Sequence, residues 1–326
     1  MNTLVVVYEL EANGRHMVAE ALDGTAEAVY LTDLDDAGRA DALRNASAVL
    51  ARTTKELRQG EIALLKDARL VQFINAGIDF VPLADMPPGV KVATNGGAYA
   101  EPMAEHALAM VLAAAKRLLV EHAALTRGEF NQFNRNRMLA GGVCGILGFG
   151  GIGIATARLM RALGMKVYAI NRSGRSEEPT DWVGTPEKLD TLLAASDVLV
   201  ICTPLTPATL GMIGAPQLAK MKDDAILVNV ARGEIVDERA LYKHLEAHPK
   251  FVACIDAWWI EPIRHGHFRM DQPFLSLPNV IGSPHNSAAA ISGTGAVGLQ
   301  RAIANIKRAL AGEAPLYLVP PEDRMM

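Results

Sequence analysis

Short apolar runs alternate with longer segments of polar residues, alanine and leucine along most of this chain. Five such runs precede residue 100, at 4–8, 28–31, 48–52, 70–75 and 90–95. A second series begins with the run at 143–147 and continues to Pro284. Alternation of this kind is typical of βαβ units, in which helices cover both faces of a parallel sheet. We therefore predict an α/β fold with two Rossmann-like, doubly wound parallel-sheet domains and an interdomain cleft.

The chain has 326 residues, which is more than one hydrophobic core usually supports. A strongly helical stretch is expected from Tyr99 to about Gly128, with Pro102 near its start. A closing helix is expected at about 288–311, and it has no sheet of its own to pack on. We predict that residues 1–97 plus 288–326 form a discontinuous substrate (catalytic) domain. Residues 98–287 would form a dinucleotide-binding Rossmann domain.

The bulk composition excludes several classes of partner. The net charge is −4 and no basic block occurs, so we expect neither nucleic acid nor an anionic membrane surface as a partner. Cys144, Cys202 and Cys254 lie in apolar runs and are expected to be small buried hydrophobes in a reducing compartment. No stretch approaches the roughly 20 apolar residues of a membrane span, and the amino terminus lacks a signal-peptide pattern. These features predict a cytoplasmic protein.

A glycine-rich turn follows the strand-like run at 143–147. It has the pattern G-x-G-x-x-G, then a helical segment and a further strand at 166–170. In this context the first glycine permits a tight turn, the second lets a diphosphate approach the backbone, and the third lets the helix pack closely. The alternative is a structural turn, for which four glycines in six residues would be entropically costly. We expect the cofactor to bind at Gly148, Phe149, Gly150, Gly151, Ile152 and Gly153.

The end of the following strand indicates which dinucleotide binds. An NAD site usually places Asp or Glu about 20 residues beyond the glycines, to hold the ribose 2′-hydroxyl. Here the chain reads Asn171, Arg172, Ser173, with no acid. Arg172 can pair with a 2′-phosphate, and its neighbours can donate hydrogen bonds to it. The sequence therefore predicts that NADP(H) is preferred, with NAD(H) possible; the alternative is that Arg172 is a solvated surface charge.

Three polar residues directly follow strand-like runs of the second series. These are Arg232, Glu261 and His285. Ligands of open parallel sheets bind beyond the carboxyl ends of the strands, so a cation, a carboxylate and an imidazole are expected at one site. Such a set can bind an anion, polarise a carbonyl and move a proton. Taken singly, they could instead be a surface charge, a turn residue and a helix cap.

Seven motifs in order make the chain resemble the D-isomer-specific 2-hydroxyacid dehydrogenases, among them the glyoxylate/hydroxypyruvate reductases. The motifs occupy residues 73–81, 95–108, 145–153, 201–213, 227–241, 255–262 and 277–289. The resemblance implies that His285 protonates the substrate carbonyl oxygen as hydride arrives. It also implies that Glu261 hydrogen-bonds the imidazole and favours its protonated form. Arg232 would bind the substrate carboxylate and polarise the carbonyl.

The same resemblance assigns binding residues. Ala76 and Gly77 would offer backbone amides to the substrate carboxylate, and Asp256 would hold the nicotinamide carboxamide. Further cofactor contacts would come from Thr203, Pro204, Thr209, Val230 and Ala231. Some relatives use an arginine on substrate anions where this chain has Arg52, although a surface arginine is an equal alternative.

The segment after Asp256 departs from the family pattern. It contains Trp258 and Trp259, followed by a longer and more basic loop. Either tryptophan could narrow the substrate pocket or pack in the core. His265 and His267 suggest a metal, but two histidines without further ligands are more often surface residues, and we predict no metal.

These inferences together predict an NADPH-preferring reduction of a small 2-keto acid, of the glyoxylate/hydroxypyruvate class, to the D-2-hydroxy acid. One alternative is a nucleotide-sensing regulatory dimer without turnover. Another is an NAD(P)-dependent dehydrogenase of a different small acid anion. The apolar helix from Pro102 and the Asn- and Arg-rich arm at 129–139 exceed what one nucleotide domain needs to cover itself, and the resemblance implies a homodimer through this region.

Overall fold

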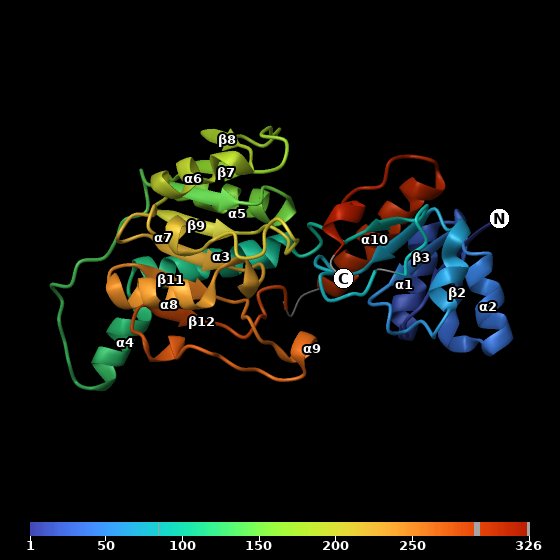
Figure 1. Ribbon diagram of the computed structural model, residues 1–326, viewed down its shortest axis with the longest axis horizontal. Helices are drawn as coiled ribbons and strands as arrows, with labels where there is room; N and C mark the ends of the chain where they lie inside the picture. The colour runs from blue at the N-terminus through green and yellow to red at the C-terminus, as the bar shows by residue number, and fades with distance from the viewer. Residues whose placement is uncertain (84, 290–293, 325–326) are drawn as a thin grey trace. The chain divides into compact units, whose positions relative to one another are not determined.

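The computed structural model describes residues 1–83, 85–289 and 294–324. The chain divides into two compact units (Figure 1). The first unit comprises Met1–Tyr99 and Ala290–Met326, and the second comprises Ala100–Ala289. Each unit is built around one parallel sheet, so the predicted α/β class is confirmed.

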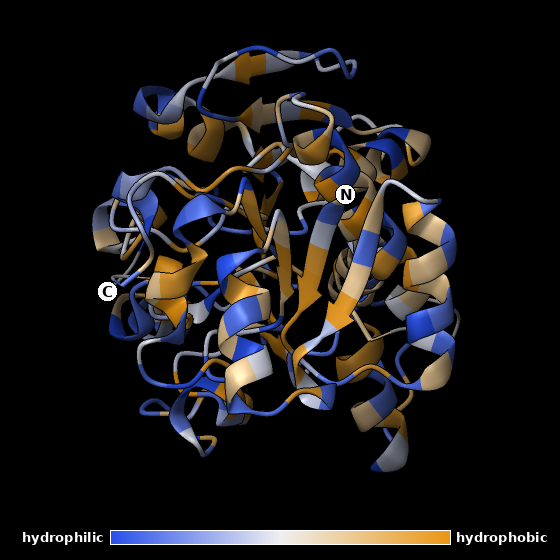
Figure 2. Cartoon of the chain, turned by 90° about the vertical axis from the view of Figure 1, so that its right-hand side faces the viewer, coloured by the Kyte–Doolittle hydropathy of each residue, from blue (hydrophilic) through white to orange (hydrophobic). Residues whose placement is uncertain are grey.

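The sheet of the first unit has five strands in the order β2-β1-β3-β4-β5, and all neighbours are parallel. The strands are β1 (Asn2–Val6), β2 (Ala26–Tyr30), β3 (Ala48–Ala51), β4 (Leu70–Phe73) and β5 (Lys91–Ala93). The helices are α1 (Ala12–Leu22), α2 (Asp36–Arg44) and α10 (Thr294–Leu310), with short 3₁₀ turns η1 (Leu31–Asp33), η2 (Glu61–Asp67) and η6 (Pro321–Asp323). Helix α10 packs on β3, β4 and α1. Figure 2 shows mostly hydrophobic strands, surrounded by helices with alternating apolar and polar faces.

The sheet of the second unit has seven parallel strands in the order β12-β11-β10-β9-β6-β7-β8. The strands are β6 (Val143–Leu147), β7 (Lys166–Ile170), β8 (Trp182–Gly184), β9 (Val198–Ile201), β10 (Ile226–Asn229), β11 (Val252–Ile255) and β12 (Val280–Gly282). The strand order reverses between β6 and β9. In a doubly wound sheet, a dinucleotide binds at such a reversal point.

Helices lie on both faces of this second sheet. They are α3 (Ala100–Ala115), α4 (Leu118–Thr126), α5 (Gly151–Ala162), α6 (Leu189–Ala195), α7 (Ala215–Leu218), α8 (Glu238–Ala247) and α9 (Pro262–His265), with 3₁₀ turns η3 (Pro186–Lys188), η4 (Gly233–Ile235) and η5 (Phe274–Ser276). Helix α3 packs on α5 and on strands β10 and β11, whereas α6, α7 and α8 follow one another in a second layer.

The prediction of one continuous helical stretch from Tyr99 to about Gly128 is wrong, because the helix is interrupted at Arg117. Arg117 adopts a left-handed backbone with φ 55°, and α4 begins one residue later. Helix α3 buries residues such as Ala107, Met110 and Val111, whereas α4 buries none. Figure 1 shows α4 and the following segment standing away from the second sheet. The closing helix expected from about 288 is described from Thr294, and residues 290–293 lie outside the described part of the chain.

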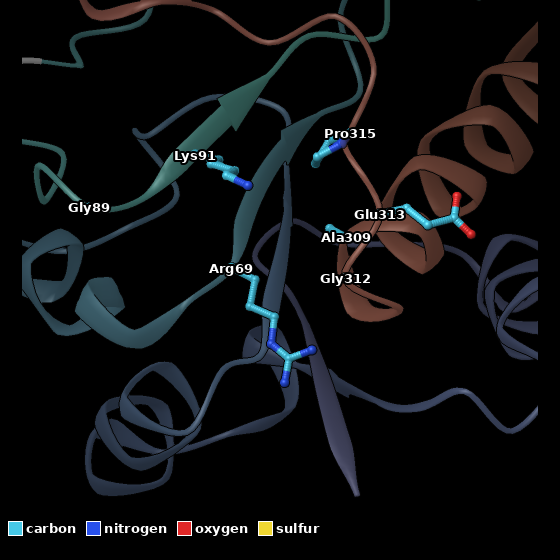
Figure 3. A pocket seen from close by; sticks show the side chains of 7 residues that line it. All are labelled: Arg69, Gly89, Lys91, Ala309, Gly312, Glu313 and Pro315. Atoms are coloured by element: carbon cyan, nitrogen blue, oxygen red, sulfur yellow. The ribbon is translucent and has the colours of Figure 1, made fainter.

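A surface cavity of about 370 Å³ lies in the first unit, at the amino ends of β4 and β5 (Figure 3). Its lining residues are Arg69, Gly89, Lys91, Ala309, Gly312, Glu313 and Pro315. The Arg69 guanidinium donates a hydrogen bond of 2.7 Å to the carbonyl of Leu310. Because these are the amino ends of the strands, the cavity lies at the sheet end opposite to the one where open α/β sheets bind ligands.

Within the described residues, none of the helices combines the length and hydrophobicity that crossing a bilayer requires. The three thiols are unpaired, and Cys144 and Cys254 are buried. Burial raises the pKa of Cys202 and of Cys254 to about 12, so both side chains are un-ionised.

Candidate active site

Arg232, Glu261 and His285 follow three neighbouring strands of the second sheet. Strand β11 lies between β10 and β12, and all three are parallel. Their last residues are aligned in register, since Asn229 pairs with Ile255 and Ile255 with Gly282. The segments that carry the three side chains therefore leave the sheet at the same end of the strands.

The imidazole of His285 is hydrogen-bonded to the carboxylate of Glu261. Nδ1 lies 2.8 Å from Oε1 and 2.7 Å from Oε2. Since an ionised carboxylate only accepts hydrogen bonds, Nδ1 is the donor and Nε2 is left for another partner. The Glu261 side chain is 8% exposed and that of His285 is 31% exposed. The pair is thus anchored in the protein on the carboxylate side and open on the imidazole side.

The pKa of Glu261 is lowered by its surroundings. Burial alone would raise this pKa, but the hydrogen bond and charge of His285 outweigh that effect. The backbone N–H of Trp258, which donates to Oε1 at 2.7 Å, and the charge of Arg232 act in the same direction. Glu261 is therefore a carboxylate at neutral pH and accepts a charge-assisted hydrogen bond from the imidazole whenever that ring is protonated.

The loop that carries Arg232 packs directly on the backbone before Glu261. A side chain at Gly233 would place its Cβ 2.5 Å from the carbonyl carbon of Trp258 and 2.6 Å from the amide nitrogen of Trp259. Glycine is thus required at 233 for this close approach. The Arg232 guanidinium also donates to the carbonyl of Ala231 at 2.8 Å. These contacts fix the loop of the cation against the segment of the carboxylate.

Local sequence accounts for the conformations of the other two segments. Glu261 is extended, at φ −126° and ψ 149°, as expected for a residue before proline, and Pro262 opens α9. His285 follows Pro284 and has a left-handed backbone with φ 51°. Non-glycine residues in this region are uncommon, and they persist where surrounding contacts hold them.

Asp256, which follows β11, is completely buried. Its carboxylate accepts hydrogen bonds from the backbone N–H groups of Asn286, at 3.2 Å, and Ser287, at 3.3 Å. The hydroxyl of Ser287 is also buried and has no hydrogen-bond partner among the described residues. Asp256 therefore holds the segment after His285, a contact that the sequence did not reveal.

The glycine turn has the geometry of a dinucleotide cradle. Gly148 has φ 97°, and a Cβ there would lie 2.5 Å from the amide nitrogen of Thr203. A Cβ on Gly153 would lie 2.3 Å from the carbonyl oxygen of Gly148. By contrast, a Cβ on Gly150 would meet nothing within 4 Å, so this position faces open space at the start of α5. The cradle fits a diphosphate held by amides at the helix start.

A compact loop follows β7 at residues 171–175. The side-chain oxygen of Asn171 accepts from the amide of Gly174 at 2.8 Å, and its nitrogen donates to the carbonyl of Arg175 at 2.7 Å. Ser173 also donates to Asn171. Asn171 and Ser173 thus organise the loop, on which Arg172 and Arg175 are both exposed. Arg175 was not among the residues predicted from the sequence, although a second arginine three residues beyond Arg172 was an available signal.

The remaining predicted cofactor residues lie near the ends of β9 and β10. Val230 is buried and Ala231 is partly buried directly after β10, while Thr203 is partly buried and Pro204 exposed after β9. The hydroxyl of Thr209 is turned onto its own loop, where it donates to the carbonyl of Pro204 at 2.7 Å.

The predicted substrate residues of the first unit lie at the carboxyl end of its sheet. Arg52 follows β3, and its guanidinium lies 4.7 Å from the ring centre of Tyr8. The carbonyl of Arg52 accepts from the side chain of Asn75, which precedes Ala76 and Gly77. The backbone of Arg52 is therefore tied to the turn that contains these two residues.

Both tryptophans pack within the second unit. The indole N–H of Trp258 donates to the carbonyl of Ser283, and that of Trp259 donates to the carbonyl of Val236. Trp259 also stacks on Phe274, with ring centres 5.2 Å apart. His265 accepts from the amide of Glu261 at 3.0 Å. Across residues 1–83, 85–289 and 294–324, no cluster of three or more His, Cys, Asp or Glu side chains has the arrangement of a metal site.

A sequence profile for the D-isomer specific 2-hydroxyacid dehydrogenase, NAD binding domain, matches residues 108–287. The chain belongs to the D-isomer specific 2-hydroxyacid dehydrogenase family. The resemblance seen in the motifs is thus confirmed, and it places the chain among oxidoreductases that act on CH–OH donors.

Three relatives in this family bear different names. The chain is 30% identical to hydroxypyruvate reductase of Thermotoga maritima, over 77% of this chain and 81% of that protein. It is 35% identical to glyoxylate/hydroxypyruvate reductase B of Enterobacter agglomerans, over 68% of each. It is 33% identical to D-3-phosphoglycerate dehydrogenase of Archaeoglobus fulgidus, over 74% of this chain but only 45% of that protein. The chain therefore spans less than half of this last relative.

Two crystal structures share the fold over nearly the whole chain. A putative formate dehydrogenase from Pyrobaculum aerophilum has a TM-score of 0.80 at 28% identity, covering 100% of both chains. A D-isomer specific 2-hydroxyacid dehydrogenase from Xanthobacter autotrophicus Py2, in complex with NADPH and MES, has a TM-score of 0.78 at 26% identity, covering 98% of each.

Proposed function

We propose that this protein reduces a small 2-keto acid of the glyoxylate/hydroxypyruvate class to the D-2-hydroxy acid, with NADPH preferred. The observation that carries the proposal is the hydrogen-bonded pair of His285 and Glu261, beside the Arg232 loop at the carboxyl end of the second sheet. Relatives named hydroxypyruvate reductase and glyoxylate/hydroxypyruvate reductase support the substrate class.

The three side chains would divide the chemistry among them. Arg232 binds the substrate carboxylate and polarises the ketone, because reduction places negative charge on the carbonyl oxygen. Nε2 of His285 donates a proton to that oxygen, since Nδ1 is engaged by Glu261. Glu261 stabilises the imidazolium before transfer and keeps the ring oriented during it. A bound nicotinamide cofactor would supply the hydride.

Residues of the second unit would hold the dinucleotide. The amides of the glycine turn bind the diphosphate. Asp256 is proposed for the nicotinamide carboxamide from the family resemblance. The buried hydroxyl of Ser287 lies on the segment after His285 and fits the same polar group.

Arg172 and Arg175 would select the cofactor by its 2′-phosphate. Two exposed guanidinium groups on one rigid loop can make charge-assisted contacts with a dianion. The absence of a carboxylate at 171–173 removes the group that would repel it. The relative crystallised with NADPH supports this preference.

The first unit would serve as the substrate domain and the second as the dinucleotide-binding domain. Ala76, Gly77 and Arg52 are proposed for the substrate anion from the family resemblance. The three unpaired thiols support a cytoplasmic location.

Oxidation of another small hydroxy acid is the second candidate. The 33% identity to D-3-phosphoglycerate dehydrogenase favours it. A sensor without turnover is disfavoured, because cofactor sensing requires no proton donor anchored by a carboxylate.

A homodimer would cover the apolar arm of the second unit. Phe130, Phe133 and Met138 are between 77% and 82% exposed, and α4 buries no residue within the protomer. Large apolar side chains gathered on one segment are typical of an interaction surface. A second copy of the chain is the occupant proposed for this surface.

A spectrophotometric screen tests the function. Oxidation of NADPH and NADH is followed in parallel with a panel of 2-keto acids, and D- and L-2-hydroxy acids are tested in the reverse direction. Turnover of glyoxylate or hydroxypyruvate with NADPH supports the proposal. Turnover only of other acids supports the second candidate, and no turnover with any acid contradicts both.

A further inference from the structure

His106 lies on α3, and its imidazole lies near the buried carboxylate of Asp256. Its Nε2 is 3.0 Å from the hydroxyl oxygen of Ser283 and 3.7 Å from Oδ1 of Asp256. The hydroxyl of Ser283 in turn donates to the same Oδ1. None of the motifs that predicted the active site assigns a task to His106 or Ser283. Together with Asp256 they form a continuous polar network, and all three residues belong to the second unit.

The directions of these hydrogen bonds are determined by the groups present. A carboxylate accepts and does not donate, so the single proton of the Ser283 hydroxyl points to Asp256. The hydroxyl oxygen is then an acceptor toward His106, and Nε2 of His106 must carry a hydrogen. The network therefore runs from the imidazole N–H through the hydroxyl to the carboxylate, and a side chain without a donor at 106 would leave it incomplete.

The carboxylate of Asp256 accepts hydrogen bonds from residues on both sides of His285. Before His285 it accepts from the side chain of Ser283, and after it from the amides of Asn286 and Ser287. Two residues, Pro284 and His285, lie between these contacts, and His285 has a left-handed backbone. Contacts on both sides are what a sparsely populated backbone conformation needs in order to persist. Asp256 thus fixes the direction in which the imidazole leaves the chain.

Helix α3 connects this network to the sheet of the second unit. It packs on β10 and β11, the strands that lead to Arg232 and to Asp256. Met110, one turn beyond His106, has its carbonyl 3.7 Å from the thiol of the buried Cys254 on β11. The His106 side chain is 26% exposed, whereas that of Asp256 has no exposure. His106 therefore joins the loop of His285 to a helix that is itself anchored on the sheet.

We propose that His106 and Ser283 are positioning residues for proton transfer by His285. They orient the carboxylate of Asp256, and Asp256 holds His285 in its left-handed conformation. The proposal rests on the proposed function in that it assigns the acid role to His285. It means that helix α3, which bears no catalytic group, also influences the rate of proton donation.

The experiment compares His106→Leu, His106→Gln and Ser283→Ala with the wild-type protein. Glutamine keeps an N–H donor near the position of Nε2, and leucine removes it. His16→Leu is the matched control, because His16 lies on α1 of the first unit and its side chain is 70% exposed. The readouts are kcat, KM for the keto acid, the isotope effect with deuterated NADPH, and hydrogen exchange of the peptide spanning residues 283–288.

His106→Leu is expected to lower kcat by about tenfold or more while KM changes by less than about threefold. The isotope effect should change, and the amides of Asn286 and Ser287 should exchange at least about ten times faster. Ser283→Ala should behave similarly, and the double variant should be no worse than either single one. His106→Gln should stay within about threefold of the wild type in kcat and in protection.

Several results would overturn the proposal. They are a kcat of His106→Leu within twofold of the wild type, an equal loss in His106→Gln, or faster exchange spread evenly over the second unit. If His106→Leu does not fold, Ser283→Ala and His106→Gln decide by the same criteria. If the wild type turns over no keto acid, the proposed function fails, and exchange of the 283–288 peptide still decides whether the network exists.

Discussion

Both carboxylate oxygens of Glu261 lie within 2.8 Å of Nδ1 of His285. This arrangement fixes the imidazole and leaves one ring nitrogen for the substrate. The charge of Glu261 strengthens this hydrogen bond and so influences the orientation of the imidazole.

Replacing Glu261 by glutamine tests this influence on activity. Glutamine keeps the shape and an acceptor oxygen but removes the charge, so the hydrogen bond that orients the imidazole is weakened. We expect kcat to fall by about 10- to 100-fold at neutral pH. Steady-state kinetics at pH 7 check this. A kcat within about twofold of the wild type would show that the carboxylate does not position the imidazole for proton transfer.

The same variant changes acid stability. The pKa of Glu261 is below its ordinary value of 4.5, so its contribution is complete above pH 4.5 and is lost as pH falls through the folded pKa. The wild type should lose stability below pH 4.5 more steeply than Glu261→Gln. Urea midpoints from pH 3 to 7 measure this, and parallel curves would contradict it.

Cofactor choice should depend on the loop after β7. Replacing Arg172 and Arg175 by alanine removes two partners of the 2′-phosphate. We expect KM for NADPH to rise by about tenfold or more, with KM for NADH nearly unchanged, because each charge-assisted contact contributes about 1.5–3 kcal/mol. Kinetics with both cofactors on the single and double variants check this. An equal rise for NADH would mean that the loop is needed for binding of any dinucleotide.

His244 should make stability depend on pH in a second window. Burial, followed by the charge of His248, lowers the pKa of His244 from 6.5 to about 4. The unfolded chain therefore takes up a proton first, and stability is lost as pH falls from 6.5 to about 4. Nε2 of His244 is buried without a hydrogen-bond partner in the described part of the chain.

His244→Phe should therefore be at least as stable as the wild type at neutral pH and lose less stability between pH 6.5 and 4. Thermal midpoints across this range, with His16→Phe as an exposed control, provide the measurement. An unchanged slope in His244→Phe would assign the pH dependence to other groups.

The arm at 129–139 should mediate self-association. The wild type is expected to sediment at about twice the protomer mass of 34.9 kDa at micromolar concentration. Aspartate at both Phe130 and Phe133 would bring charge into that contact and should give a monomer. Leu316→Asp, at an exposed apolar residue of the first unit, is the control and should stay dimeric. A wild-type monomer would contradict the proposal.

Local patterns predicted the strands well where apolar residues were continuous. The run at 166–170 is strand β7 with the same bounds, and 143–147 is β6. Strand β8 was not predicted, because its three residues form a short strand at the end of the sheet, beside β7. The break at Arg117 was also missed, since no glycine or proline marks it.

The active site could be predicted from the sequence only in part, because some of its contacts join residues that are far apart in the chain. The carboxyl ends of parallel strands share an edge, so the neighbourhood of Arg232, Glu261 and His285 could be inferred from strand order alone. The link from His106 to Ser283 spans 177 positions in the chain. No periodicity or spacing within one segment encodes such a pairing, and the polar network around Asp256 therefore emerged only with the fold.

Substitution of His285 by alanine tests the central claim most directly. Alanine removes the proton donor while the glycine turn and the 171–175 loop remain. We predict that turnover of the best 2-keto acid falls by at least about 100-fold, whereas the affinity for NADPH, measured by fluorescence titration, stays within about threefold. Turnover close to that of the wild type, or a loss of activity fully explained by weaker NADPH binding, would contradict the account.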